Sequence, residues 1–207
     1  MKPAKKRRLV LGVTGGVGCG KSEVGRILER WGWAVCDADD LAHEALAPGG
    51  AAYGPVVEWF GAHILAPDGT VARDRLAQIV FQDARARAEL NARVHPVVCR
   101  ALREWLEGPA REKDAAAIVP LLFEAGWTAG WTAILCVVAS DQTVRERLAR
   151  RGWSEEESLR RIAAQWPLEE KKKRADYVIK NDGTLAELER AVRCVVDRIG
   201  EQEENKT

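Results

Sequence analysis

Residues 8–22 read Arg8-Leu-Val-Leu-Gly-Val-Thr14, followed directly by Gly15-Gly-Val-Gly-Cys-Gly-Lys-Ser22. An apolar run leads into a glycine-rich turn, and a helical pattern follows the Lys-Ser pair. The spacing fits G-x-x-x-x-G-K-[ST], the phosphate-binding loop that connects a strand to a helix. A dinucleotide-binding G-x-G-x-x-G motif fits less well, because its third glycine would fall on Lys21.

The residue types in this loop suit the phosphates of a nucleotide. Glycines reach backbone angles that turn successive N–H groups toward one anion, and the helix that opens near Gly20 adds its positive end. Lys21 supplies a charge for the β- and γ-phosphates, and the Ser22 hydroxyl is a ligand for Mg²⁺. We therefore predict a nucleotide site formed by Gly16, Val17, Gly18, Cys19, Gly20, Lys21, Ser22 and Glu23.

Two residues of the loop are chemically unusual at their positions. Cys19 is expected at a helix N-terminus beside Lys21, and both features lower the pKa of a thiol. We therefore predict that Cys19 is the most reactive cysteine of the chain and that its alkylation blocks the phosphate site. Glu23 brings a negative charge beside the phosphates, which weakens nucleotide binding unless the side chain points away.

Composition and charge restrict the class of protein. The chain has 207 residues, which suits one domain with a small insertion, and a formal net charge of +1, which argues against an extended nucleic-acid surface. The five cysteines form no Cys-x-x-Cys pair and indicate reduced thiols in a cytoplasmic protein. No apolar run is long enough to span a membrane. We expect small-molecule substrates, no nucleic-acid or membrane partner, and a monomer or weak homo-oligomer.

Strand and helix patterns alternate along the chain. Short apolar runs that predict further strands occupy Trp33–Cys36, Ala115–Val119, Thr132–Val138 and Ala175–Lys180. The run from Thr132 is continuous, as in a central parallel strand that is covered on both faces. The pattern predicts an α/β fold of three layers, the phosphate-loop NTPase or kinase fold, with a mainly parallel five-stranded sheet.

Residues 42–112 interrupt this alternation with a helical pattern that is rich in Ala and Arg. Arg73–Phe81 reads as one helix, and Ala84–Trp105 as one or two more, because His95-Pro96 should kink or break the second stretch. We interpret this segment as a helical insertion that binds substrate.

Carboxylates follow the second predicted strand, at Asp37, Asp39 and Asp40. Ligands of open α/β folds bind where parallel strands end. We expect Asp39 or Asp40 to cap the next helix, and at least one of Asp37 and Asp39 to take part in the chemistry. The acidic residue that usually follows a strand such as Ala115–Val119 is absent, so Asp37 or Asp39 is the first candidate for the carboxylate on the magnesium side and Glu124 the second.

Arginines gather in the helical segment 141–165. Asp141 and Ser154 are candidate N-caps for two helices joined at Gly152. Such a pair is typical of the lid of a phosphate kinase, where an arginine offsets the charge that develops on the transferred phosphoryl group. For any single one of these arginines, a surface charge paired with Glu155–Glu157 is the better explanation, but as a group they favour a lid.

Three functional classes contain a phosphate loop: small-molecule kinases, GTP-driven switches and ATP-binding assembly proteins. A switch needs Asn-Lys-x-Asp to recognise guanine, and an assembly protein needs an acidic residue at the end of the strand near Val119; the sequence has neither. The arginine-rich segment and the early acidic pair favour a kinase, which needs a base for the acceptor hydroxyl.

As a set, the motifs resemble the dephospho-coenzyme A kinase family from residue 9 to about residue 198. The matching pieces are Thr14–Ser22, Asp37-Ala-Asp39, Asp68-Gly69 with Arg73, His95-Pro96, Pro120-Leu-Leu-Phe-Glu124, Arg150, Arg161 with Gln165, and Ala175–Gly183. The resemblance implies phosphorylation of the ribose 3′-hydroxyl of dephospho-CoA, with ATP as co-substrate and Mg²⁺ as cofactor, which is the final step of coenzyme A synthesis. A kinase of nucleoside monophosphates or of another small metabolite is the alternative.

The resemblance also implies a division of the chain and roles for single residues. It implies a nucleotide-binding core at residues 1–41, 113–140 and 166–200, a CoA-binding insertion at 42–112 and a lid at 141–165; we expect the tail at 201–207 to be frayed. Asp39 or Asp37 would activate the hydroxyl, and Lys21 and Arg150 would stabilise the phosphoryl group. Asn181 and Gly183 would lie near the adenine of ATP. Further implied ligands are Asp39, Arg73, His95, Leu122, Glu124 and Arg161 for the acceptor, and Ser22 and Asp37 for Mg²⁺.

Overall fold

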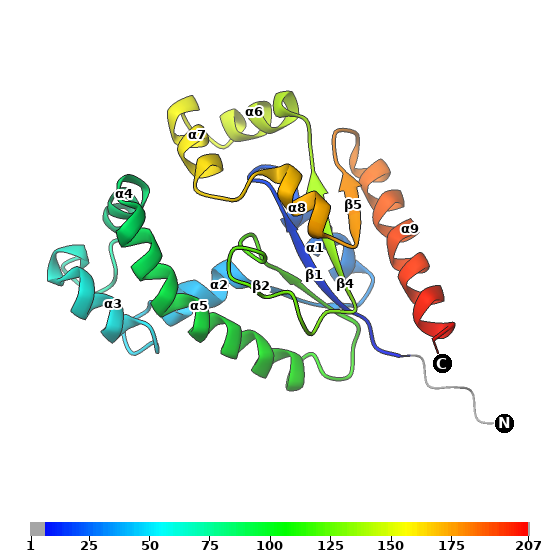
Figure 1. Cartoon of the computed structure of the whole chain (residues 1–207), viewed down its shortest axis with the longest axis horizontal. Coiled ribbons are helices and arrows are strands. Elements are labelled where there is room, and N and C mark those ends of the chain that lie inside the picture. Colours follow the sequence, from blue (N-terminus) through cyan, green and yellow to red (C-terminus); the bar gives the residue numbers. More distant parts are fainter. Residues whose placement is uncertain (1–6, 207) are drawn as a thin grey trace. The chain divides into compact units, whose positions relative to one another are not determined.

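The computed structural model of the chain describes residues 7–206, which divide into two compact units. One unit holds residues 7–36 and 108–206 and contains the β-sheet, and the other holds residues 37–107 and is helical (Figure 1).

The sheet has five strands in the order β2-β3-β1-β4-β5. They are β1 (Val10–Gly15), β2 (Ala34–Asp37), β3 (Ala115–Ile118), β4 (Ala133–Val138) and β5 (Tyr177–Lys180). The central strand β1 pairs in parallel with β3 and β4, and β4 pairs in parallel with β5. The carboxyl ends of these strands therefore meet at one edge of the sheet, and the loops that follow them lie together.

Helices cover both faces of this sheet, as Figure 1 shows. Against one face lie α1 (Lys21–Arg30) and α9 (Leu185–Glu204), which also contact each other, while α8 (Leu168–Arg174) lies against β1 and β4. Two more helices, α6 (Asp141–Arg150) and α7 (Glu155–Ala163), form a helical arm between β4 and α8. The expected three-layer α/β fold is confirmed.

The core under β1 is apolar and closed to water. Leu11 and Val13 have no exposed surface, and they belong to one cluster with Val24 and Ile27 of α1 and Val192 of α9. Each such side chain contributes about 1.5–3 kcal/mol by leaving water. The loop that follows β1 is thus carried by a rigid strand and a rigid helix.

The helical unit contains α2 (Ala38–Ala45), α3 (Tyr53–Phe60), the 3₁₀ turn η1 (Ala62–Ile64), α4 (Arg73–Gln82) and α5 (Ala84–Glu107). The long helix α5 contacts α2, α3 and α4. The sequence pattern predicted a kink or break at His95-Pro96, and a break there is wrong: α5 is one helix with Pro96 inside it. Val94 and Val98 are buried on either side, and this packing outweighs the backbone hydrogen bond that proline removes.

Two expectations about helix ends are also wrong. Ser140 rather than Asp141 caps α6, because the Ser140 hydroxyl accepts a hydrogen bond from Thr143 N and Asp141 is the first helical residue. The tail was expected to fray from residue 201, yet α9 continues to Glu204, and buried Glu203 pairs with Arg7 and Lys206. Position 207 of that predicted tail lies outside the described residues.

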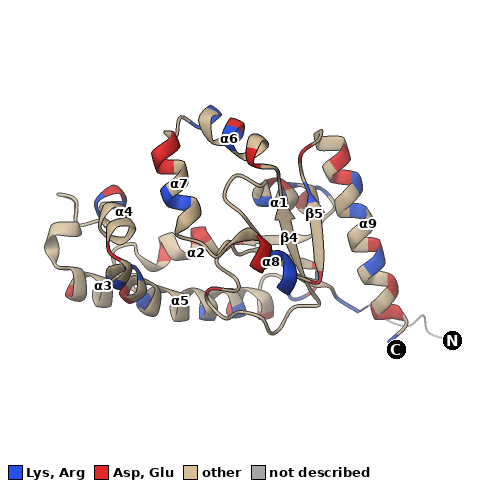
Figure 2. Ribbon diagram, turned by 45° about the horizontal axis from the view of Figure 1, so that its top comes forward, with Lys and Arg blue, Asp and Glu red and all other residues tan. Residues whose placement is uncertain are grey.

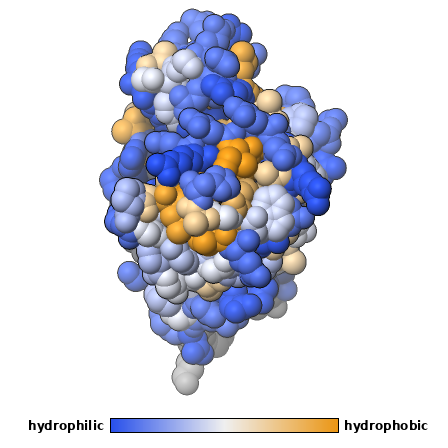
Figure 3. Space-filling model, turned by 90° about the vertical axis from the view of Figure 1, so that its left-hand side faces the viewer, coloured by the Kyte–Doolittle hydropathy of each residue, from blue (hydrophilic) through white to orange (hydrophobic). Residues whose placement is uncertain are grey.

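Charges of both signs alternate over the helices in Figure 2. In α8 the acidic residues occupy the first turn and the basic residues the last, which complements the helix dipole. The face in Figure 3 is mainly hydrophilic, with one apolar patch. Among the described residues, no helix is long and apolar enough to cross a membrane.

Candidate active site

The phosphate loop lies between β1 and α1, at the carboxyl edge of the sheet. Its glycines are required by geometry at two positions. Gly15 has a φ of 141°, and a Cβ there would overlap the carbonyl oxygen of Val137; Gly20 has a φ of 99°, and a Cβ there would overlap the Asn181 amide. Both positions require glycine because other residues of the same chain, Val137 and Asn181, approach the backbone too closely for a Cβ.

Lys21 is the first residue of α1, and its ammonium group lies over the loop. Lys21 Nζ donates to Gly16 O at 2.8 Å and to Gly15 O at 3.2 Å. Ser22 is exposed in the first turn of α1, as a metal-binding hydroxyl requires. Glu23 pairs with Arg26 at 2.7 Å on the same helix, and this pairing reduces the field that its charge exerts on the loop.

Asn181 and Arg147 hold the phosphate loop from outside. The buried Asn181 side chain follows β5, and its Nδ2 donates to Cys19 O at 2.8 Å. Arg147 of α6 donates to Asn181 Oδ1 at 3.3 Å and, more weakly, to Gly18 O at 3.4 Å. Asn181 was expected near adenine, and its contacts in the structure are to the loop backbone. Gly183 is exposed two residues further on, next to the Glu187 side chain.

The prediction that Cys19 is the most reactive cysteine is contradicted. Its side chain is 1% exposed, and burial raises the pKa of the Cys19 thiol; the nearby charge of Lys21 lowers it by less. The sequence argument included the helix terminus and the lysine but could not include desolvation. Cys194 of α9, in contrast, is exposed.

The acidic pair sits at the junction of β2 and α2. Asp37 is the N-cap of α2, and its Oδ1 accepts a hydrogen bond from Asp39 N at 2.9 Å. The expectation that Asp39 or Asp40 caps the helix is therefore wrong, because α2 begins at Ala38. Asp39 is exposed in the first turn of α2, where its charge is favourable with the helix dipole.

The loop after β3 contributes two of the predicted residues. Leu122 is fully buried, and its Cδ1 would lie 2.8 Å from a Cβ at Gly12, so this side chain packs in the core. Glu124 is nearly buried, pairs with Lys171 of α8 at 2.8 Å and accepts a hydrogen bond from Trp166 N at 2.9 Å.

The helical arm carries Arg150 and Arg161. Arg150 is exposed in the last turn of α6. Arg161 of α7 bonds Glu157 Oε1 at 2.9 Å, and its guanidinium lies 4.1 Å from the ring centre of Trp153. The two arginines are therefore held differently, because Arg161 packs on Trp153 whereas Arg150 is exposed.

In the helical unit, Arg73 is the exposed first residue of α4, and His95 is half-buried within α5. No group of three His, Cys, Asp or Glu side chains in residues 7–206 could hold a metal ion by itself. A Mg²⁺ ion that arrives with nucleotide phosphates needs only one or two protein oxygens, and the exposed Ser22 hydroxyl is a candidate for one of them.

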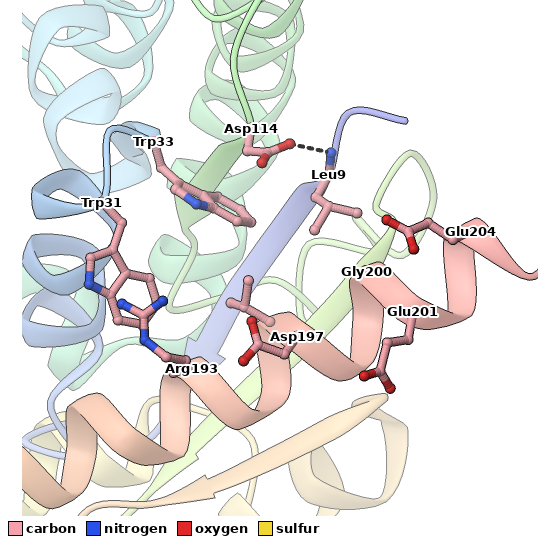
Figure 4. A pocket seen from close by; sticks show the side chains of 10 residues that line it. Leu9, Trp31, Trp33, Asp114, Arg193, Asp197, Gly200, Glu201 and Glu204 are labelled. Atoms are coloured by element: carbon pink, nitrogen blue, oxygen red, sulfur yellow. Dashed lines mark hydrogen bonds between the residues drawn. The ribbon is translucent and has the colours of Figure 1, made fainter. Parts of the chain in front are cut away.

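A cavity of about 500 Å³ lies at the opposite edge of the sheet, beside α9 (Figure 4). Three residues that line the cavity directly precede strands: Leu9 precedes β1, Trp33 precedes β2 and Asp114 precedes β3. This cavity is therefore separate from the phosphate loop, which follows the other end of β1.

Two residues of the site were not singled out from the sequence. Arg147 follows the buried Val144 by three positions, so helical spacing could have placed it beside the packed face of α6. Lys171 is completely buried, and a lysine in a run of four basic residues gives no such signal.

Known proteins resemble this chain along most of its length. The sequence model of the family described as dephospho-CoA kinase matches residues 9–187. A dephospho-CoA kinase of Gloeobacter violaceus is 42% identical over 193 residues, which are 92% of this chain and 93% of that protein. A solved structure from Thermus thermophilus is 38% identical, covers 93% of this chain and 98% of its own, and superposes with a TM-score of 0.77.

A solved dephospho-CoA kinase from Campylobacter jejuni is 24% identical and has a TM-score of 0.66. The match covers 95% of this chain and 100% of that one, and it shows the same fold.

Proposed function

The chain belongs to the dephospho-CoA kinase family, and we propose on that premise that it transfers the γ-phosphoryl group of ATP to the ribose 3′-hydroxyl of dephospho-CoA. The products are ADP and coenzyme A, so the reaction is the final step of coenzyme A synthesis. The observation that carries this proposal is the family match over residues 9–187, which includes the complete phosphate loop. The five reduced cysteines support a cytoplasmic enzyme, and we propose a monomer or weak homo-oligomer.

The phosphate loop supplies the binding of ATP in this proposal. Backbone N–H groups between Gly16 and Gly20 bind the phosphates, and Lys21 neutralises charge on the β- and γ-phosphates. In the structure Lys21 Nζ donates to two carbonyl oxygens of this loop, Gly16 O at 2.8 Å and Gly15 O at 3.2 Å. Mg²⁺ held by Ser22, with Asp37 as the proposed second oxygen ligand, would offset the charge of the transferred group.

The acceptor hydroxyl needs a base, and we propose Asp39, with Asp37 as the alternative. Asp39 is exposed in the first turn of α2, whereas Asp37 Oδ1 caps this helix. Arg73, His95, Glu124 and Arg161 remain proposed acceptor ligands, whereas the predicted ligand Leu122 is withdrawn because its side chain is buried in the core. Residues 42–112 remain the proposed acceptor-binding part. Residues 141–165, with Arg150, are the proposed lid that covers the phosphoryl group.

Product analysis with a Lys21 variant tests this proposal. Incubation with ATP, Mg²⁺ and dephospho-CoA should yield coenzyme A, seen by mass spectrometry as the gain of one phosphoryl group. Lys21→Ala should lower the rate on the order of a hundredfold or more, because it removes a charge-assisted contact to the transferred group.

The control is circular dichroism, which should show a folded variant. Normal turnover by folded Lys21→Ala would contradict the assignment of the phosphate loop, and unchanged dephospho-CoA with the wild type would contradict the proposed acceptor.

A further inference from the structure

Lys171 is a completely buried charge in the sheet-containing unit. It lies in α8, and its side chain has 0% exposure. Its Nζ donates to Pro120 O at 2.7 Å, to Glu124 Oε1 at 2.8 Å and to Gln165 Oε1 at 3.2 Å. An ammonium group has three donors, so all of them are satisfied.

These acceptors come from two segments that are far apart in the sequence. Pro120 and Glu124 belong to the loop after β3, and Gln165 belongs to the connection between α7 and α8. Glu124 Oε1 also accepts a hydrogen bond from Trp166 N at 2.9 Å in the same connection. Lys171 and Glu124 together therefore fasten the end of the helical arm to the sheet.

The same network reaches the start of the phosphate loop. Thr14 Oγ1 donates to Pro120 O at 3.2 Å, so Thr14 and Lys171 share one acceptor. Thr14 is fully buried in β1, one residue before Gly15. Leu168 of α8 also lies 3.6 Å from a Cβ built at Gly16. The contacts thus join the phosphate loop, the loop after β3 and the end of the arm.

The Lys171–Glu124 pair is a buried ion pair. A buried ion pair is often replaceable by apolar side chains without loss of stability. In addition, Glu124 Oε2 is buried and has no hydrogen-bond partner among the described residues. Such a cost is expected where polar partners are kept to define one geometry rather than to stabilise the fold.

We propose that Lys171, held by Glu124, is a positioning residue for phosphoryl transfer. It touches no reacting atom; it fixes the point at which the arm of α6 and α7 leaves the sheet, relative to the phosphate loop. A correctly placed arm brings its arginines to the phosphoryl group and excludes water, so that the phosphoryl group passes to the acceptor hydroxyl. A displaced arm admits water, and ATP plus water then gives ADP, phosphate and a proton. The inference rests on the proposed function.

The test compares Lys171→Met with Lys172→Met. Methionine has nearly the length of lysine and no charge. Lys172 is the next residue of α8, is partly exposed and pairs with Glu169 of the same helix, so it is the matched control. Coenzyme A and ADP are measured in the same reaction, together with KM values and the melting temperature.

For Lys171→Met we expect coenzyme A formation per folded enzyme to fall on the order of a hundredfold, since a small misplacement is that costly. The KM values should change less than about threefold, and the ratio of ADP to coenzyme A should rise well above one. Lys172→Met should keep a ratio of one. A purely structural role would lower ADP and coenzyme A together, in proportion to the folded fraction.

If Lys171→Met does not fold, Lys171→Gln, which keeps a hydrogen-bond donor in place of the charge, is measured instead. A ratio that stays at one in the folded variant overturns the inference while leaving the proposed function intact. Wild-type enzyme that forms no coenzyme A from dephospho-CoA overturns both.

Discussion

Arg147 and Arg150 lie one helical turn apart on α6, but their surroundings differ. Arg147 is half-buried and bonds Asn181 and the phosphate-loop backbone, whereas Arg150 is exposed. Under the proposed function, Arg147 would shape the ATP site before ATP binds, and Arg150 would contact the phosphoryl group during transfer. We expect the two side chains to affect different kinetic constants.

Substitution of each arginine by methionine tests this division. Arg147→Met should raise the KM for ATP about tenfold, the effect of about 1.4 kcal/mol from lost charged hydrogen bonds, and should lower the melting temperature. Arg150→Met should leave the melting temperature unchanged and lower kcat on the order of a hundredfold. Steady-state kinetics and thermal unfolding measure both. Wild-type kcat in Arg150→Met would remove Arg150 from the list of catalytic residues.

Cysteine reactivity also follows from single-residue environments. Cys194 is exposed, while burial raises the pKa of the Cys19 thiol and that of the Cys136 thiol, the latter to about 11. Iodoacetamide at limiting concentration should therefore label Cys194 first, with little loss of activity. Peptide mapping by mass spectrometry reads out the order. Early labelling of Cys19 that ATP prevents would contradict the burial of Cys19.

At the scale of elements, Asp182 connects the ends of two strands. It follows β5, and its Oδ1 accepts a hydrogen bond at 2.6 Å from Ser140 N, which follows β4. This bond lowers the pKa of Asp182 to about 2, from an ordinary value of 3.8. The folded state therefore binds fewer protons than the unfolded state between these values. The stabilisation is complete above about pH 4 and is lost as the pH falls toward 2.

Asp182→Asn should accordingly lower the melting temperature at pH 5 and above, and the difference from wild type should shrink steadily between pH 4 and pH 2. Thermal unfolding by circular dichroism over this pH range measures it. Asp197→Asn, which changes an exposed carboxylate on α9, serves as control and should show no comparable convergence. A pH-independent difference for Asp182→Asn would mean that the carboxylate charge is not involved.

Local sequence signals predicted most helices and strands. The errors arose where several neighbouring residues could have taken the same role. The glycine-lysine pattern predicted a helix that opens near Gly20, and α1 begins at Lys21. Helix caps were harder, because Asp37, Asp39 and Asp40 are chemically alike and only the backbone decides which one precedes the first turn. The short charged helix α8 has no apolar periodicity, so its position depends on the buried contacts of Lys171.

At the scale of the whole molecule, the sequence could not predict the contacts of the site between residues that are far apart in the chain. The phosphate loop is a local motif, and the strand before it and the helix after it follow from the sequence pattern. Its support by Asn181, and the Lys171–Glu124 pair, join residues that are distant in sequence, and no single pattern encodes such a pair. The fold brings them together because the strands are parallel and their following loops share one edge.

The proposed function makes one prediction for the whole chain, which concerns the choice of acceptor. A phosphate loop alone transfers phosphoryl groups slowly to water, so discrimination must come from elsewhere. The proposed acceptor-binding part, residues 42–112, is large for an acceptor as small as AMP, and under the proposed function it would hold a ligand with a long pantetheine tail. Binding energy from this tail should promote the reaction at the ribose. If Arg73 holds the diphosphate of the acceptor, Arg73→Ala should reduce the ratio of kcat/KM for dephospho-CoA to kcat/KM for adenosine or AMP.

The most direct measurement is kcat/KM for dephospho-CoA, adenosine, AMP, CMP and shikimate, with phosphorylated product quantified for each acceptor. Dephospho-CoA should exceed every other acceptor by orders of magnitude, because only this substrate offers both the ribose hydroxyl and the tail. A faster reaction with AMP, CMP or shikimate would contradict the assignment and identify a kinase of nucleotides or of another small metabolite.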